Sequence, residues 1–194
     1  MKETKLKFGV IGSGSWATAL IKILSENNND INWYIRNTEN IKFIKENSHN
    51  PNYLSSVELN LKKLKISAEI NEVVEASNVI IIAVPSEYVN DEMKKIYLDI
   101  SKKIIICALK GLVPETNLLF GEHMQKHFGI SPNKFLVIGG PCHAEEVALE
   151  KLSYLTIGSS NLELCKIISE KFSCKYINCL LYTSPSPRDF LLAR

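Results

Sequence analysis

Two glycines separate an apolar segment from a helical pattern near the N-terminus. The apolar run at residues 6–11 is followed by Gly12 and Gly14, and from Trp16 onwards apolar residues recur at helical spacing. Gly12 permits a tight turn, Gly14 keeps a Cβ away from an approaching anion, and Ala17 is small enough for the helix to pack on the strand. The first N–H groups of the helix would then face phosphates. The pattern predicts a dinucleotide-binding turn; the alternative is an ordinary glycine-rich loop.

Beyond this turn, apolar strands alternate with helical segments. We expect strands at residues 6–11, 31–35, 79–84, 104–108 and 135–138, followed respectively by helices from residue 16, at 39–47, at 86–96, at 118–128 and from residue 144. Residues 79–84 are apolar at every position, as in parallel strands that helices cover on both faces. The order predicts an α/β fold with a doubly wound, Rossmann-type, mostly parallel sheet and helices on both faces. Its ligand should lie outside the carboxyl ends of the strands.

The amino-acid composition limits which classes of partner and which cellular compartment can be expected. The chain has 194 residues, which suits one α/β domain, and its 23 basic and 21 acidic residues are interspersed, so nothing indicates nucleic-acid binding. The N-terminus lacks the apolar core of a signal peptide and the apolar runs are too short for membrane insertion. The five cysteines are odd in number and show no metal-ligand spacing, so we expect no metal and no disulfide framework. A cytoplasmic location follows as the expectation.

Three strand ends carry candidate ligand-binding residues. Arg36 stands where an NAD-selective fold usually has an acid; its guanidinium suits a 2′-phosphate or stacking on adenine, unless it is a solvated surface group. Arg36 therefore favours tolerance of NADP, and it does not exclude NAD as the cofactor. Pro85 ends the next strand, beside the nicotinamide end of the expected cofactor, and Ser86 is expected to cap the following helix. Lys110 brings a cation to the same edge, where it could bind a phosphate or polarise a carbonyl, although most lysines are solvated.

A fourth strand end is rich in glycine. Gly139 and Gly140 permit a close backbone approach, and the helix from Ala144 can present N–H groups to an anion. Cys142 and His143 are adjacent, but neighbouring residues point apart and nothing orients the histidine. The pair therefore does not indicate a nucleophile.

The chain resembles a known enzyme family in five segments. They are residues 12–20 (Gly-Ser-Gly-Ser-Trp-Ala-Thr-Ala-Leu), 50–54 (Asn-Pro-Asn-Tyr-Leu), 83–86 (Ala-Val-Pro-Ser), 109–112 (Leu-Lys-Gly-Leu) and 140–148 (Gly-Pro-Cys-His-Ala-Glu-Glu-Val-Ala). In order and spacing they resemble the NAD(P)-dependent glycerol-3-phosphate dehydrogenases of the bacterial type. The resemblance runs from about residue 5 to residue 178.

The resemblance implies reversible reduction of dihydroxyacetone phosphate to sn-glycerol 3-phosphate, for glycerophospholipid synthesis, with NADP or NAD as cofactor. It implies substrate contacts by Lys110, Gly140 and Cys142, where the family commonly has Ser or Thr in place of Cys142. By position it also implies a set of cofactor-contacting residues: Ser15, Trp16, Arg36, Asn37, Tyr53, Lys110 and Ala144, beside Gly12, Gly14 and Pro85 of the strand ends.

The C-terminal segment departs from the family. Residues 1–178 are expected to form the cofactor domain, whereas residues 179–194, with Ser184-Pro185-Ser186-Pro187, are an atypical tail. The resemblance places the catalytic general acid/base, a lysine, in a helical domain beyond this segment, so we expect no catalytic residue in these 194 residues and little activity from them alone. It allows a homodimer of the full-length protein. Two alternatives stay open: a non-catalytic dinucleotide-binding module, or a related Rossmann reductase of a small keto acid.

Overall fold

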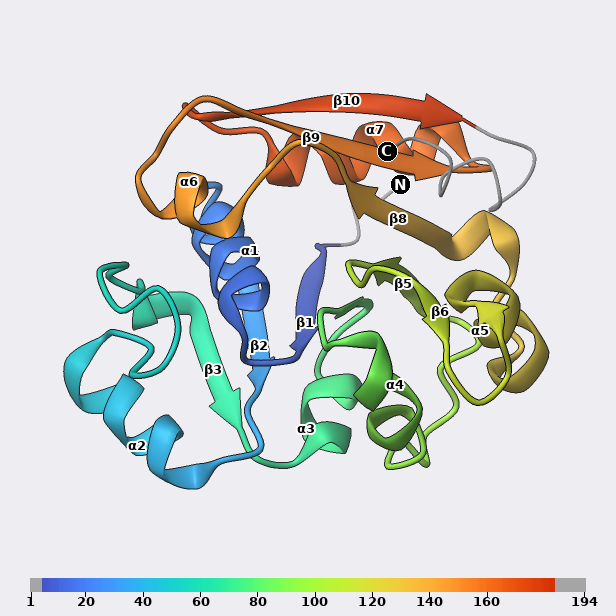
Figure 1. Ribbon diagram of the computed structural model, residues 1–194, viewed down its shortest axis with the longest axis horizontal. Helices are drawn as coiled ribbons and strands as arrows, with labels where there is room; N and C mark the ends of the chain where they lie inside the picture. The colour runs from blue at the N-terminus through green and yellow to red at the C-terminus, as the bar shows by residue number, and fades with distance from the viewer. Residues whose placement is uncertain (1–4, 184–194) are drawn as a thin grey trace.

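One eight-stranded sheet organises the fold. The computed structural model describes residues 5–183, and its sheet has the order β10-β9-β8-β5-β4-β1-β2-β3 (Figure 1). The strands are β1 (Lys7–Ile11), β2 (Asp30–Tyr34), β3 (Leu64–Ser67), β4 (Val79–Ile82), β5 (Ile104–Cys107), β8 (Phe135–Gly139), β9 (Ser153–Ser159) and β10 (Ile177–Thr183). Neighbouring strands are parallel except β8 and β9, which are antiparallel.

Helices and one small hairpin complete the described chain. The α-helices are α1 (Ser15–Glu26), α2 (Thr38–Asn47), α3 (Ile70–Glu75), α4 (Ser86–Met93), α5 (Phe120–Phe128), α6 (Ala144–Ala148) and α7 (Leu162–Phe172), and short 3-10 turns occur at Leu61–Lys63 and Pro132–Lys134. Strands β6 (Leu112–Val113) and β7 (Leu118–Leu119) form a separate antiparallel hairpin. No helix in the described residues is long and apolar enough to cross a membrane.

The sheet reverses its strand order beside β1. Strands β2 and β3 lie on one side of β1, and β4 and β5 lie on the other. Ligands of doubly wound sheets bind at such a switch point, outside the carboxyl ends of the strands. The topology therefore places the candidate site where β1 and β4 end.

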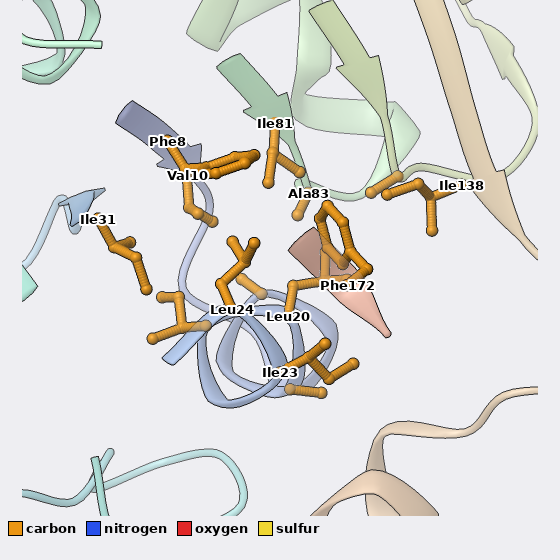
Figure 2. Packing of buried hydrophobic residues seen from close by; sticks show 14 of the residues in the cluster. Phe8, Val10, Leu20, Ile23, Leu24, Ile31, Ile81, Ala83, Ile138 and Phe172 are labelled. Carbon is orange, nitrogen blue, oxygen red and sulfur yellow. The ribbon is translucent and has the colours of Figure 1, made fainter. Parts of the chain in front are cut away.

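Apolar helix faces cover both sides of the sheet. Helices α1, α6 and α7 contribute to one buried cluster and α3, α4 and α5 to the other. Figure 2 shows Leu20 and Leu24 of α1 on the side that faces Val10 of β1. In the same cluster the ring of Phe172, from α7, meets that of Phe8 edge-on at a centroid distance of 6.1 Å. Full burial of each such leucine contributes about 1.5–3 kcal/mol.

Strand β4 shows why its apolar run predicted a central strand. Val79 and Ile81 belong to one cluster, whereas Ile80 and Ile82 belong to the other. Because successive strand side chains point to opposite faces, a strand covered on both faces must be apolar throughout. The predicted fold class is confirmed in the mostly parallel sheet with helices on both faces.

Several elements of the structure have no counterpart in the sequence prediction or differ from it in their bounds. Strand β3, helix α3, strand β9, helix α7 and strand β10 were not predicted. The helix expected at 118–128 begins only at Phe120, because Leu118–Leu119 pairs in the hairpin, and α4 ends at Met93 rather than at residue 96. Strand β10 continues to Thr183, and it pairs with β9 beyond residue 178. The Ser-Pro segment of residues 184–187 lies outside the described residues.

Candidate functional site

The carboxyl ends of four strands form the floor of the candidate site. Ile11 of β1 pairs with Ile82 of β4, Ile82 pairs with Cys107 of β5, and Cys107 pairs with Val137 of β8. The segments that follow these residues therefore leave the same edge of the sheet side by side. They contain the glycine turn, Pro85, Lys110 and Gly140, so the fold brings these sequence-predicted positions to one edge.

Gly12 occupies a position that only glycine fits. Its φ is +125°, and a Cβ built there would lie 2.3 Å from the carbonyl oxygen of Ala83. The backbone of β1 is also joined to this segment, because the N–H of Ala83 donates to the carbonyl oxygen of Ile11 at 2.8 Å. The turn is thus held tightly against the end of β4, as the tight turn in the sequence prediction requires.

Gly14, in contrast, faces open space. It is the N-cap of α1 with extended backbone (φ −76°, ψ −176°), and no heavy atom lies within 4 Å of an added Cβ. No side chain caps this helix and its first turn has no acidic residue. The start of α1, with Ser15 and Trp16 partly exposed, therefore offers uncapped N–H groups and the positive end of the helix dipole. These features fit a dinucleotide pyrophosphate.

Asn50 stabilises the glycine turn by hydrogen bonds, although it lies outside the unit formed by β1, the turn and α1. This side chain is 2% exposed. Its Nδ2 donates to the carbonyl oxygen of Ser13 at 3.1 Å and to Oγ1 of Thr18 at 2.9 Å. Its Oδ1 accepts from the N–H of Tyr53 at 3.3 Å, so the same residue positions Tyr53 near the turn. No local sequence pattern marks Asn50 as a positioning residue, although it belongs to the segment 50–54 that carries the family resemblance.

Arg36 and Asn37 follow the end of β2, whereas Tyr53 belongs to the segment that Asn50 ties to the glycine turn. Tyr53 is 43% exposed. Arg36 is an exposed residue whose Nη1 lies 3.5 Å from Oε1 of Glu92 on α4. Asn37 caps α2, since its Oδ1 accepts from the N–H groups of Glu39 and Asn40 at 2.8 and 3.1 Å. That cap engages the side-chain oxygen of Asn37, so its amide nitrogen is the group it can offer to a ligand.

The expectation that Ser86 caps the following helix is wrong. Pro85 is the N-cap of α4, with φ −57° and ψ 143°, and no side chain makes a capping hydrogen bond. Ser86 is already the first residue of the helix. Pro85, whose ring fixes φ close to the helical value, takes the N-cap position in its place. Its Oγ lies 3.6 Å from where a Cβ of Gly111 would be, and Gly111 has φ +96°. Ser86 therefore borders the exposed loop that carries Lys110.

Gly140 and Cys142 form a tight turn after β8. Gly140 has φ +114°, and a Cβ there would lie 3.0 Å from the carbonyl oxygen of Tyr154. The N–H of Cys142 donates to the carbonyl oxygen of Gly140 at 2.9 Å. Burial raises the pKa of the half-buried Cys142 thiol, so the thiol stays protonated at neutral pH. This supports the prediction that Cys142 and His143 are not a nucleophilic pair.

Ala144 opens α6 and is buried against α1. It is 8% exposed within the cluster that includes the apolar face of α1. Helix α6 packs on α1, which brings the segment after β8 close to the helix of the glycine turn. Among the described residues, no group of three or more His, Cys, Asp or Glu side chains could hold a metal ion.

Known proteins match this chain over nearly its whole length. The family model for the N-terminus of NAD-dependent glycerol-3-phosphate dehydrogenase matches residues 7–165. The NAD(P)+ glycerol-3-phosphate dehydrogenase of Macrococcus caseolyticus is 32% identical over 183 residues, and that of Bacillus pumilus is 30% identical over 181 residues. Each alignment covers 92% of this chain but 54% and 52% of the relatives. The chain thus spans about half the length of the curated relatives it matches.

Solved structures show the same fold. The glycerol-3-phosphate dehydrogenase of Coxiella burnetii superposes with a TM-score of 0.81 at 24% identity, covering 94% of this chain and 55% of that chain. The enzyme of Saccharomyces cerevisiae gives 0.77 at 20% identity, covering 92% and 56%. The fold is thus shared with these enzymes, and the match to the family model favours the glycerol-3-phosphate dehydrogenases over the keto-acid reductase alternative.

Proposed function

Because the chain belongs to the NAD-dependent glycerol-3-phosphate dehydrogenase family, whose N-terminal part it matches, we propose that it binds NAD or NADP along the carboxyl edge of its sheet. In the whole protein this domain serves the reversible reduction of dihydroxyacetone phosphate to sn-glycerol 3-phosphate, which supplies glycerophospholipid synthesis. The observation that carries the proposal is the pair of glycines. Gly12 packs so closely against the Ala83 carbonyl oxygen that no side chain fits there. Gly14, in contrast, has free space beside it at the uncapped start of α1.

The cofactor-contacting residues are assigned by their place along the edge. The pyrophosphate lies at Gly14, Ser15 and Trp16, where the first helical turn presents its N–H groups. The adenosine side lies at the end of β2, beside Arg36, Asn37 and Tyr53. The nicotinamide side lies toward Pro85, Lys110 and Ala144, because these residues follow β4, β5 and β8.

The substrate lies beyond the nicotinamide side. Lys110 supplies a cation for its charged group. Gly140 offers the substrate a backbone contact, while the close approach of the Tyr154 carbonyl oxygen is what requires glycine at this position. Cys142 offers a thiol, a poorer hydrogen-bond donor than the hydroxyl common in the family, so a backbone contact is the stronger part of its role. When bound, the reduced nicotinamide supplies a hydride to the ketone carbon of the substrate.

The proton in this reaction is assigned to a lysine outside the 194 residues, in the half of the relatives that this chain does not match. A positioned general acid typically contributes 10²–10⁴-fold. Residues 1–194 alone should therefore bind the cofactor without measurable turnover. A homodimer of the longer protein is part of the proposal, as is a reducing, cytoplasmic location. The latter rests on the odd number of cysteines, five, which does not suit a disulfide framework.

Fluorescence titration with NADH tests the proposal. The 194-residue chain should give saturable binding at one site, and joining it to the helical half of a family member should give turnover of dihydroxyacetone phosphate. Rapid turnover by the 194-residue chain itself would contradict the assignment of the proton to an external lysine. Binding without turnover in the joined protein would favour a non-catalytic dinucleotide-binding module.

A further inference from the structure

A buried carboxylate faces the arginine that would read a 2′-phosphate. Glu92 lies on α4 and is 5% exposed. Its Oε1 lies 3.5 Å from Nη1 of Arg36, and its Oε2 lies 2.9 Å from Nζ of Lys95. Most of the Arg36 side chain is in solvent, at 73% exposure, whereas the Glu92 side chain is 7% exposed. The contact therefore joins a buried anion on α4 to a solvent-exposed cation at the end of β2.

The surroundings of Glu92 keep its charge in place. Tyr34, the last residue of β2, is buried beside it, and burial followed by the Glu92 charge raises the pKa of the Tyr34 hydroxyl. Lys95 remains paired with Glu92 whether or not Arg36 does. A buried carboxylate needs at least one such partner. Arg36 can thus move away from Glu92 without leaving a buried charge unpaired. Its guanidinium can pair either with the Glu92 carboxylate or with the 2′-phosphate of NADPH.

NADPH and NADH differ in what they offer at this point. The 2′-phosphate of NADPH is an anion that must share the Arg36 guanidinium with Glu92, and the two anions repel each other across a few ångströms. The ribose hydroxyl of NADH carries no charge, so it neither competes for Arg36 nor meets this repulsion. Glu92 therefore acts against one cofactor and not against the other.

We propose that Glu92 is a specificity-determining residue, which restrains Arg36 and lowers the affinity for NADPH relative to NADH. The inference rests on the proposed dinucleotide binding, and it assigns to α4 a part in cofactor selection. Lys95 moderates the effect, because it neutralises part of the Glu92 charge. We expect a preference shift of about three- to tenfold rather than a complete reversal.

Titrations of the 194-residue chain with NADPH and NADH test the inference. Glu92→Gln should raise the ratio of NADPH affinity to NADH affinity about three- to tenfold. Glu163→Gln is the matched control: Glu163 pairs with Lys166 at 2.8 Å, also three residues on, but on α7. It removes the same charge from a pair with the same spacing, at an exposed position away from Arg36, and should leave the ratio unchanged. In an Arg36→Ala background, Glu92→Gln should raise the ratio less than it does with Arg36 present, because only the direct repulsion between Glu92 and the phosphate is then relieved.

Each outcome decides the inference. An unchanged ratio, or a fall in NADPH affinity, would overturn it; the fall would mean that Glu92 orients Arg36 toward the phosphate. If circular dichroism shows that Glu92→Gln does not fold, Glu92→Asp should shift the ratio in the same direction, because the shorter carboxylate withdraws from Arg36. If the wild-type protein binds neither dinucleotide, the proposed function is overturned as well. If it binds both and Glu92→Gln leaves the affinity ratio unchanged, only this inference is overturned.

Discussion

The indole nitrogen of Trp33 donates a hydrogen bond of 2.6 Å to the carbonyl oxygen of Gly12. Trp33 is fully buried in β2, and Gly12 begins the turn after β1. The contact holds the glycine turn from the side of the neighbouring strand, while Ala83 confines it from the side of β4. The conformation of the turn is therefore set by two strands that are distant in sequence.

Trp33→Phe should destabilise the protein and weaken cofactor binding together. Phenylalanine fills much of the buried space but leaves the Gly12 carbonyl oxygen without its donor, at a cost of about 1–3 kcal/mol. Urea unfolding should show the loss in free energy of unfolding, and NADH titration should show reduced affinity under conditions where the variant is folded. Loss of stability with unchanged affinity would show that the hydrogen bond does not shape the binding turn.

Gly14→Val and Gly12→Ala should fail in different ways. Valine at Gly14 meets no protein atom and suits the extended backbone there, so the fold should survive. Its side chain would fill the space assigned to the pyrophosphate, and binding of NADH should fall below detection. Alanine at Gly12 would place a Cβ 2.3 Å from the Ala83 carbonyl oxygen, so folding itself should suffer. Circular dichroism beside calorimetric titration separates the two; wild-type affinity in Gly14→Val would place the dinucleotide elsewhere.

Arg36→Ala should weaken NADPH binding by about tenfold or more and NADH binding by less than about threefold, because a charge-assisted contact contributes about 1.5–3 kcal/mol. Alanine is preferable to aspartate, since a new carboxylate would face Glu92. Fluorescence titration with both cofactors gives the comparison. Equal losses would indicate that Arg36 stacks on adenine, which both cofactors share.

Stability at high pH should depend on Cys107. Burial in β5 raises the pKa of this thiol from 9.0 to about 12. The raised pKa means that the folded state holds the proton more tightly than the unfolded state. The stabilisation is thus complete below pH 9 and is lost as the pH rises toward about 12. From about pH 8 to about pH 10, wild type should lose about 1 kcal/mol more than Cys107→Ala in urea unfolding. Parallel pH profiles would show that the thiol does not contribute.

Local sequence was enough to predict the central part of the sheet. Strands β4 and β5 are apolar throughout and β1 is buried after its first residue, Lys7, because both faces of these strands are covered. A run of this kind can be recognised without knowledge of its neighbours. The edge strand β10 was missed, because only its first residue is buried and the remaining ones are half-buried or exposed. Strand β3 alternates incompletely for the same reason, since an edge strand has one partner and little core to pack against.

For the site, the sequence by itself determined the glycine turn, since Gly12 and Gly14 mark a backbone path that side chains would block. It also determined the residues at the strand ends, because parallel strands bring their carboxyl ends to one edge. Only the tertiary structure decided what surrounds them. Asn50 fastens the turn, Trp33 supports it, and Glu92 faces Arg36. Each of these contacts joins segments far apart in the chain, and their partners are set by how the helices pack on the sheet, which no local pattern of residues records.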